Sequence, residues 1–204
     1  MDEIADRAGE MAVTFARSVI EGYLADETVP ADPPPRSQLT DRRGAFVTLE
    51  TEGDLRGCIG RPYPAQTGVE AIRESAIGAA TEDPRFPPVS ADELSAITVE
   101  VSVLGTPDPI GADSGSVEEY VRIGRDGLIV SDGGRRGLLL PQVPVTRNWT
   151  PTEYLRQTCR KAGLPADCYR DGAVTVERFT ADVFGETAPD GPVERIDLGE
   201  AALA

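Results

Sequence analysis

The chain has 204 residues, of which 40% are hydrophobic and only 5% aromatic, so its length fits one domain with a largely aliphatic core. It carries 35 acidic and 20 basic side chains and no histidine, which gives a formal net charge of −15 at pH 7. This charge argues against nonspecific nucleic-acid binding, because such binding depends on basic side chains that replace the counterions of phosphates.

The first half of the chain combines two predicted helices with three strands. In order, we expect a helix over 4–24, a proline-rich connector over 30–35, strands over 45–49 and 55–60, a helix over 67–80 and a strand over 97–104. Thr67 and Glu70 have the spacing of a capping box at the start of the second helix, and Ser90 and Glu93 repeat that spacing before a short helical turn. The strand over 97–104 alternates apolar and polar residues, which is typical of a half-buried strand.

The second half begins with a Gly/Pro/Ser/Asp-rich loop over 105–116, a candidate boundary between two lobes. We then expect a short helix over 117–121, strands over 127–131 and 137–140, a helix over 150–163 and a strand over 173–184. Thr150, Pro151 and Glu153 supply a cap, a proline at the first helical position and an acidic third residue. The domain is predicted to cover 1–187, and the acidic tail over 188–204 is expected to be mobile.

Short hairpin strands mixed with a few helices predict an α+β fold with a mainly antiparallel sheet. The chain contains neither a GxGxxG segment between a strand and a helix nor a P-loop, so no cofactor is expected. No apolar run is long enough to span a bilayer, and the acidic N-terminal residues lack the pattern of a signal peptide. We therefore expect a cytoplasmic protein without a membrane segment.

The three cysteines are Cys58, Cys159 and Cys168. They form no CxxC pair, and no histidine is present to complete a zinc site, so no metal is expected. An odd number of cysteines in a cytoplasmic chain predicts free thiols. Cys159 and Cys168, together with Trp149, are interpreted as packing residues.

Lys161 is the only lysine among the basic residues. An acidic, lysine-poor surface predicts adaptation to concentrated cytoplasmic salt, where the Debye length is about 3 Å at 1 M and carboxylate repulsion is screened. The alternative is an ordinary acidic protein from a GC-rich genome, in which arginine codons displace lysine. The charge balance favours salt adaptation.

Six segments occur in one order across most of the chain. They are LRGCIG at 55–60, DPRFPPV at 83–89, EVSVL at 100–104, GRDGLIV at 124–130, RRGLLLPQV at 135–143 and TCRKAGLP at 158–165. Together they resemble the AMMECR domain family over roughly residues 10–187, and the acidic composition resembles an archaeal, halophile-like member. The resemblance implies a two-lobed single α+β domain in which LRGCIG lines a cleft between the lobes. It also implies that no biochemical activity is settled.

Strand alternation places Arg56 and Cys58 on one face of their strand, and Glu100 and Ser102 on the corresponding face of theirs. In a functional interpretation, Arg56 stabilises a thiolate or a bound anion while Glu100 accepts a proton, so that Cys58 and Glu100 are the candidate catalytic residues. In a structural interpretation, Arg56 and Glu100 form an ion pair and Cys58 is a small filler. Because no histidine is available to activate the thiol, a ligand-lining role for Cys58 is favoured over catalysis.

Four further residues are candidate ligand-binding residues beside Arg56 and Ser102. Gly57 and Gly60 either allow a ligand to approach the backbone or serve tight sheet packing. Asp83 and Arg85 lie in a loop that either closes over the cleft or caps local structure around Phe86. Arg135 and Arg136 form a turn that is either an anion site or simply solvated.

Two function classes follow. The favoured one is a ligand- or partner-binding accessory domain in a modification pathway, because microbial relatives in the resembled family are often encoded with or fused to Memo-like and radical-SAM proteins. The alternative is a small-molecule or modified-nucleotide enzyme that uses the Arg56, Cys58 and Glu100 cleft. Whether the chain is an enzyme, which small ligand it binds and which protein partner it has are left open by the sequence.

Overall fold

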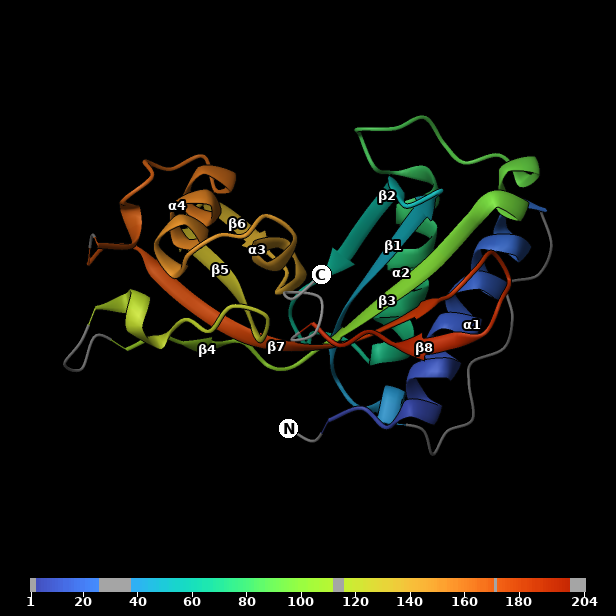
Figure 1. Ribbon diagram of the computed structural model, residues 1–204, viewed down its shortest axis with the longest axis horizontal. Helices are drawn as coiled ribbons and strands as arrows, with labels where there is room; N and C mark the ends of the chain where they lie inside the picture. Colours follow the sequence, from blue (N-terminus) through green and yellow to red (C-terminus); the bar gives the residue numbers. More distant parts are fainter. Residues whose placement is uncertain (1–2, 26–37, 112–115, 171, 199–204) are drawn as a thin grey trace. The chain divides into compact units, whose positions relative to one another are not determined.

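The structure is a computed structural model that describes residues 3–25, 38–111, 116–170 and 172–198. The predicted proline-rich connector over 30–35 lies outside these residues. The chain divides into two compact units (Figure 1). Unit 1 comprises Met1–Leu104 and Asp182–Ile196, and unit 2 comprises Gly105–Ala181 and Asp197–Ala204. Both units combine helices with antiparallel strands, which confirms the predicted α+β class.

Unit 1 is a sheet packed against two helices. Its helices are α1 (Asp6–Leu24), α2 (Gly68–Thr81) and the short 3₁₀ helices η1 (Gln38–Thr40) and η2 (Ala91–Ala96). Its strands are β1 (Gly44–Thr51), β2 (Asp54–Arg61), β3 (Ile97–Leu104), the C-terminal part of β7 (Thr175–Glu186) and β8 (Val193–Arg195). The strand order is β2-β1-β3-β7, and β8 also pairs with β7. β2 is therefore an edge strand.

The core of unit 1 follows directly from strand alternation. Ala45, Val47 and Leu49 of β1 are buried, as are the three valines Val99, Val101 and Val103 of β3. They form one hydrophobic cluster with the apolar sides of α1 and α2. The Thr67 hydroxyl accepts the backbone N–H of Glu70, and the Glu70 carboxylate accepts the N–H of Thr67 in return, so the predicted capping box begins α2.

A buried ion pair joins α1 to the C-terminal part of β7. The Arg17 guanidinium donates to both carboxylate oxygens of Glu186 and, at 2.6 Å, to the carbonyl of Ile97. The Oε2 oxygen of the same carboxylate also accepts the N–H of Val99 at 3.0 Å. Both side chains are almost fully buried, at 7% and 3% exposed, so the charges satisfy each other inside the unit.

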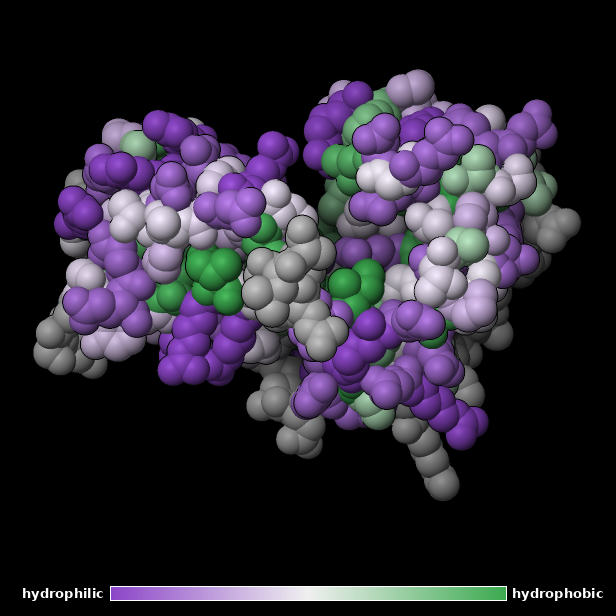
Figure 2. Space-filling model, in the orientation of Figure 1, coloured by the Kyte–Doolittle hydropathy of each residue, from purple (hydrophilic) through white to green (hydrophobic). Residues whose placement is uncertain are grey.

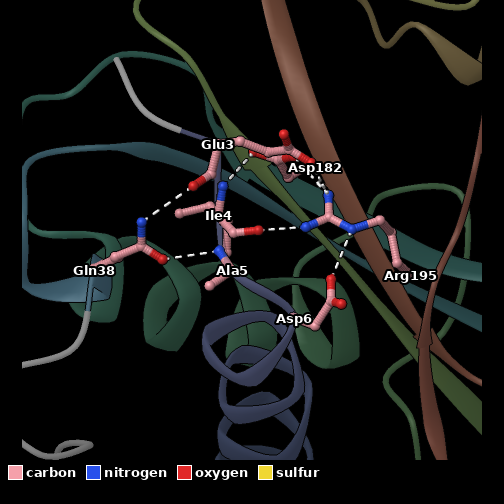
Figure 3. A network of polar contacts seen from close by, with 7 residues as sticks. All are labelled: Glu3, Ile4, Ala5, Asp6, Gln38, Asp182 and Arg195. Carbon is pink, nitrogen blue, oxygen red and sulfur yellow. Dashed lines mark hydrogen bonds and ion pairs between the residues drawn. The ribbon is translucent and has the colours of Figure 1, made fainter.

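Residues near the two ends of the chain meet in a second network of unit 1 (Figure 3). It comprises Glu3, Ile4, Ala5, Asp6, Gln38, Asp182 and Arg195. Arg195 of β8 forms ion pairs with Asp182, Asp6 and Glu3 at 2.8, 2.9 and 3.3 Å. The Asp182 carboxylate also accepts the N–H of Ile4, at 3.0 Å. The expectation of a mobile tail is therefore wrong for residues 193–195, because β7 and this network hold them in place.

Unit 2 contains the remaining elements. They are β4 (Asp108–Pro109), η3 (Val117–Tyr120), β5 (Asp126–Asp132), β6 (Arg135–Leu139), α3 (Gln142–Thr146), α4 (Pro151–Lys161), η4 (Cys168–Arg170) and the N-terminal part of β7. β5 lies between β6 and β7, and β4 pairs with β7. Thr150 caps α4 as predicted, and its bonds with Glu153 complete a capping box. The fully buried Tyr154 of α4 donates its hydroxyl proton to the carbonyl of Leu139 at 2.9 Å, which ties α4 to β6.

A disulfide joins Cys159 and Cys168 in unit 2, so the expectation of three free thiols is wrong. After α4 the chain reverses at Gly163, whose φ of +71° favours glycine, and this reversal returns η4 to the helix. The two Cα atoms lie 6.0 Å apart, within the range that a disulfide spans. Cys58 is not part of a disulfide.

The face of the molecule shown in Figure 2 is largely hydrophilic, with small and separate hydrophobic areas. This agrees with the acidic composition. Among the described residues, no helix is long and apolar enough to cross a membrane.

Candidate functional site

The antiparallel register of unit 1 aligns several of the predicted site residues. Cys58 of β2 lies opposite Thr48 of β1, and Thr48 lies opposite Glu100 of β3. Residues that are directly opposite share a face of the sheet, so Cys58, Thr48 and Glu100 form one row across three strands. Ser102 lies two residues farther along β3 on the same face. We call Thr48, Cys58, Glu100 and Ser102 the polar sheet face; it is the face opposite α1 and α2, because Val99 and Val101 point into the helical core.

The pairing of β1 with β2 contains a bulge at Arg56. Leu49 lies opposite Gly57, whereas the next residue, Glu50, lies opposite Leu55, so Arg56 is the extra residue. Because of this extra residue, simple alternation along β2 does not predict which face of the sheet Arg56 and Leu55 occupy. Leu55 is 38% exposed, so it does not pack against the helices as uninterrupted alternation along the strand would predict.

Arg56 binds the segment that leads from α2 to β3. Its guanidinium donates to the Glu93 carboxylate at 2.8 Å and to the carbonyl oxygens of Pro87 and Pro88 at 3.0 and 3.4 Å. Glu93 is thus the ion-pair partner that the structure records for Arg56, where the structural interpretation expected Glu100. Glu93 does not complete the predicted capping box of η2, since the Ser90 side chain makes no cap bond.

Asp83 and Arg85 cover the edge of β2 at Cys58. The buried Asp83 carboxylate accepts the N–H of Cys58 at 2.8 Å and binds the Arg85 guanidinium at 2.6 Å. Arg85 in turn donates to the carbonyl of Cys58 at 3.5 Å. The bond from Arg85 holds the pKa of Asp83 well below its usual value, although burial opposes this shift. Together the two side chains occupy the hydrogen-bonding positions that a neighbouring strand would otherwise occupy.

Phe86 links these two anchors. Its ring centre lies 5.5 Å from the Arg85 guanidinium carbon and 5.9 Å from that of Arg56, distances typical of cation–π contacts. The ring is half-buried rather than a deep core anchor. The segments LRGCIG and DPRFPP therefore form one local structure, in which each holds the other in place.

The two glycines of LRGCIG leave space that other atoms of this chain occupy. A Cβ at Gly57 would lie 2.2 Å from the carbonyl oxygen of Ala79 in α2, and one at Gly60 would lie 2.2 Å from the Phe46 ring. Larger residues at these positions would displace α2 or Phe46. This geometry accounts for both glycines by packing, the structural alternative of the sequence analysis.

The half-buried Cys58 thiol accepts a hydrogen bond from the Thr48 hydroxyl at 3.4 Å. Glu100 lies on the other side of β1, so its backbone is two strand spacings from Cys58, roughly 9–10 Å. Glu100 and Cys58 therefore lie on one face of the sheet, but their backbones are too far apart to contact each other. Burial raises the pKa of Glu50, which lies two residues along β1 from Thr48.

Sequence reasoning missed Thr48 and Glu93 as parts of this region. Alternation along the strand over 45–49 places Thr48 opposite the buried face, so this residue could have been found. Glu93 could not, because its pairing with Arg56 depends on the path of the loop after α2. Arg135 and Arg136, by contrast, are exposed on β6 in unit 2, where Arg135 pairs with Asp132 at 2.7 Å. Among the described residues, no group of three or more Cys, Asp or Glu side chains is arranged to hold a metal ion.

Comparisons with known proteins give a consistent result over nearly the whole chain. The model of the AMMECR1 family matches residues 13–184. A protein of Thermococcus gammatolerans is 49% identical over 206 residues, which cover 97% of this chain and all of that protein. Protein MJ0810 of Methanocaldococcus jannaschii is 48% identical over 190 residues, covering 91% of this chain and 93% of that protein.

One solved structure has the same fold. The crystal structure of the uncharacterized protein PH0010 from Pyrococcus horikoshii is similar to this chain with a TM-score of 0.90 and 44% identity, covering 95% of this chain and 98% of that one. These relatives come from thermophilic archaea, so they support the archaeal part of the resemblance and give no support to salt adaptation.

Proposed function

Because this chain belongs to the AMMECR1 family, we propose that it is a ligand- or partner-binding accessory domain rather than a standalone enzyme. The family resemblance suggests a modification pathway shared with Memo-like and radical-SAM proteins. In this proposal the binding surface is formed by the half-buried Thr48, Cys58 and Glu100 of the polar sheet face of unit 1, whereas Ser102 of that face is only 1% exposed.

The observation that carries the proposal is that Arg56, Asp83 and Arg85, the charged residues of the two segments around Cys58, are bonded within the chain's own structure. Arg56 is bonded to Glu93 and to two proline carbonyls, and Arg85 is bonded to Asp83, which holds the backbone of Cys58. A nucleophilic thiol requires an adjacent base or cation that is available to activate it. Arg56 and Arg85 each have a carboxylate partner of their own. This supports a binding role over catalysis by Cys58.

The same contacts bear on the alternative, a small-molecule or modified-nucleotide enzyme. Proteins commonly bind phosphate through the donor fork of an arginine. Arg56 and Arg85 already direct their forks at carboxylates, and the row beside them contributes the carboxylate of Glu100. The polar sheet face is therefore better suited to a ligand or protein segment that donates hydrogen bonds than to one that carries phosphate.

Binding to purified candidate partners tests the proposal. The chain is immobilised, and a Memo-like protein and a radical-SAM protein from the same organism are passed over it. We expect one of them to bind, and we expect Glu100→Gln and Thr48→Ala each to weaken that binding about tenfold, because both side chains belong to the polar sheet face. Glu10→Gln, on an exposed position of α1, is the matched control and should leave binding unchanged.

Turnover by the isolated chain would contradict the proposal. If the purified chain converted a small substrate, and Cys58→Ser abolished that conversion while the fold persisted, the enzyme alternative would be correct. Iodoacetamide labelling of Cys58 against pH gives an independent measurement, since a nucleophilic cysteine labels at a pH well below that of a model thiol.

A further inference from the structure

We infer that the disulfide between Cys159 and Cys168 is a redox-responsive staple that holds η4 against α4 and, through η4, fixes η3 of unit 2. Cys159 lies in the last turn of α4 and Cys168 begins η4. Their exposed fractions are 0% and 6%, and both belong to the hydrophobic core of unit 2. The bond therefore crosslinks the core itself rather than a surface loop.

The segment between the two cysteines is closed in two further ways. The N–H of Leu164 donates to the carbonyl of Cys159 at 3.0 Å, which ends α4 in the turn formed by Gly163. Arg156 of α4 pairs with Asp167 at 2.9 Å, and both side chains are substantially exposed. The exposed ion pair contributes little by itself, so the return of the chain to α4 is held by the disulfide together with the buried side chains of Leu164 and Tyr169.

Residues that follow Cys168 directly carry the effect to η3. The hydroxyl of Tyr169 and the guanidinium of Arg170 both donate to one carboxylate oxygen of Glu118, at 2.9 and 2.8 Å. Burial raises the pKa of Glu118, but the bonds from Arg170, from the backbone N–H of Glu118 itself and from Tyr169 together outweigh burial and lower it to about 2. Glu118 thus depends on the position of η4, and the disulfide sets that position.

The chemistry of the staple is an ordinary thiol–disulfide exchange. A dithiol reductant supplies two electrons and two protons, the S–S bond breaks into the thiols of Cys159 and Cys168, and the reductant closes to its own disulfide. Because both sulfur atoms are buried, the reductant reaches them only when η4 opens away from α4. Reduction is therefore slow in the folded protein and becomes fast when unit 2 loosens.

Trp149 provides a selective probe, because it is the only tryptophan of the chain and packs against the core of unit 2. Thermal unfolding is followed by Trp149 fluorescence in the oxidised protein, in the protein reduced with dithiothreitol, and in the double variant Cys159→Ala/Cys168→Ala. We expect the last two to unfold roughly 10 °C below the first. Cys58→Ala is the matched control, and its transition should shift with dithiothreitol as that of the parent chain does.

Hydrogen exchange tests the coupling to η3. Reduction should speed amide exchange of residues 117–121 about tenfold and leave the amides of β1 and β3 unchanged. Glu118→Gln should remove most of this redox effect at residues 117–121, which a disulfide acting on α4 alone would not do. Two results would overturn the inference: three titratable thiols in protein that is denatured without prior reduction, or exchange at 117–121 that is the same in both redox states.

Discussion

The two units reach a stable core with very different charges. Unit 1 has 23 acidic and ten basic side chains, a net charge of −13, whereas unit 2 has twelve acidic and ten basic side chains, a net charge of −2. Nearly all of the chain's −15 is therefore concentrated in the unit that carries the polar sheet face. An argument from the charge of the whole chain, such as the exclusion of nucleic-acid binding, applies with full force only to unit 1.

The units also differ in what holds distant segments together. Unit 1 contains no disulfide in its described residues and relies on ion pairs, of which Arg17 with Glu186 is buried and the Arg195 network is partly exposed. Unit 2 has the covalent bond between Cys159 and Cys168. The comparison predicts that unit 1 responds to loss of charge and unit 2 to reduction.

The largest expected effect is the loss of the buried ion pair of unit 1. Arg17→Met should destabilise unit 1 by about 3–5 kcal/mol, because it leaves the Glu186 carboxylate buried without its countercharge. Urea unfolding followed by hydrogen exchange of β3 measures this loss. Arg61→Met is the control: it removes an ion pair with Glu74 whose side chains are about half exposed and should cost at most about 1 kcal/mol. If the two variants lost equal stability, burial of the ion pair would not be the reason for its importance.

A smaller effect is expected at the covered edge of β2. Asp83→Asn should cost about 1–3 kcal/mol, because the amide lacks the charge that binds Arg85. Amide exchange at Cys58 should accelerate, since its N–H loses a charged acceptor. Asp92→Asn, at an exposed position of η2, is the control and should change neither quantity. An unchanged exchange rate at Cys58 in Asp83→Asn would mean that this side chain does not protect the edge.

In unit 2 the acid response is expected to come from Glu118. Its pKa of about 2 in the folded chain lies below the ordinary value of 4.5, so its contribution is complete above pH 4.5 and is lost as the pH falls toward 2. We expect a loss of about 1–2 kcal/mol over this range, less than the full shift implies because Arg170 is exposed to solvent. The Trp149 transition of the parent chain should show this loss, and Glu118→Gln should show much less of it.

The smallest expected effect is that of salt. Lowering salt from molar to tens of millimolar should destabilise unit 1 more than unit 2, because unscreened repulsion grows with net charge. The melting temperature of unit 1, measured by hydrogen exchange of β1 and β3, is compared with that of unit 2, measured by Trp149 fluorescence. Equal melting temperatures of unit 1 across the range would remove the hypothesis of salt adaptation.

Local signals in the sequence predicted much of the fold. The capping boxes at Thr67 and Thr150 place the starts of α2 and α4 correctly, because a cap involves only residues three positions apart. The alternation over 97–104 predicted β3 to the residue and the burial of its three valines. It also predicted that Glu100 and Ser102 share a face, although the ligand of that face stays a prediction.

Features that depend on tertiary structure could not be predicted in this way. The bulge at Arg56 is visible only once β1 and β2 are paired, and it directs the guanidinium to Glu93. The disulfide requires the chain to reverse at Gly163, and the rule that cytoplasmic cysteines stay reduced pointed away from it. The short strand β8 has little local preference of its own and is held by Arg195, two of whose ion-pair partners, Glu3 and Asp6, lie almost the whole chain away.

The ion pair between Arg17 and Glu186 has a consequence for the order in which the molecule is made. Its two residues are separated by 169 positions, and all of the continuous stretch Gly105–Ala181 is synthesised between them. On the ribosome, α1 and β1–β3 emerge first but lack the carboxylate that neutralises Arg17, whereas this stretch of unit 2 is complete before residue 186 appears. The part of the chain that is translated first therefore acquires its finished core only after most of unit 2 has been made.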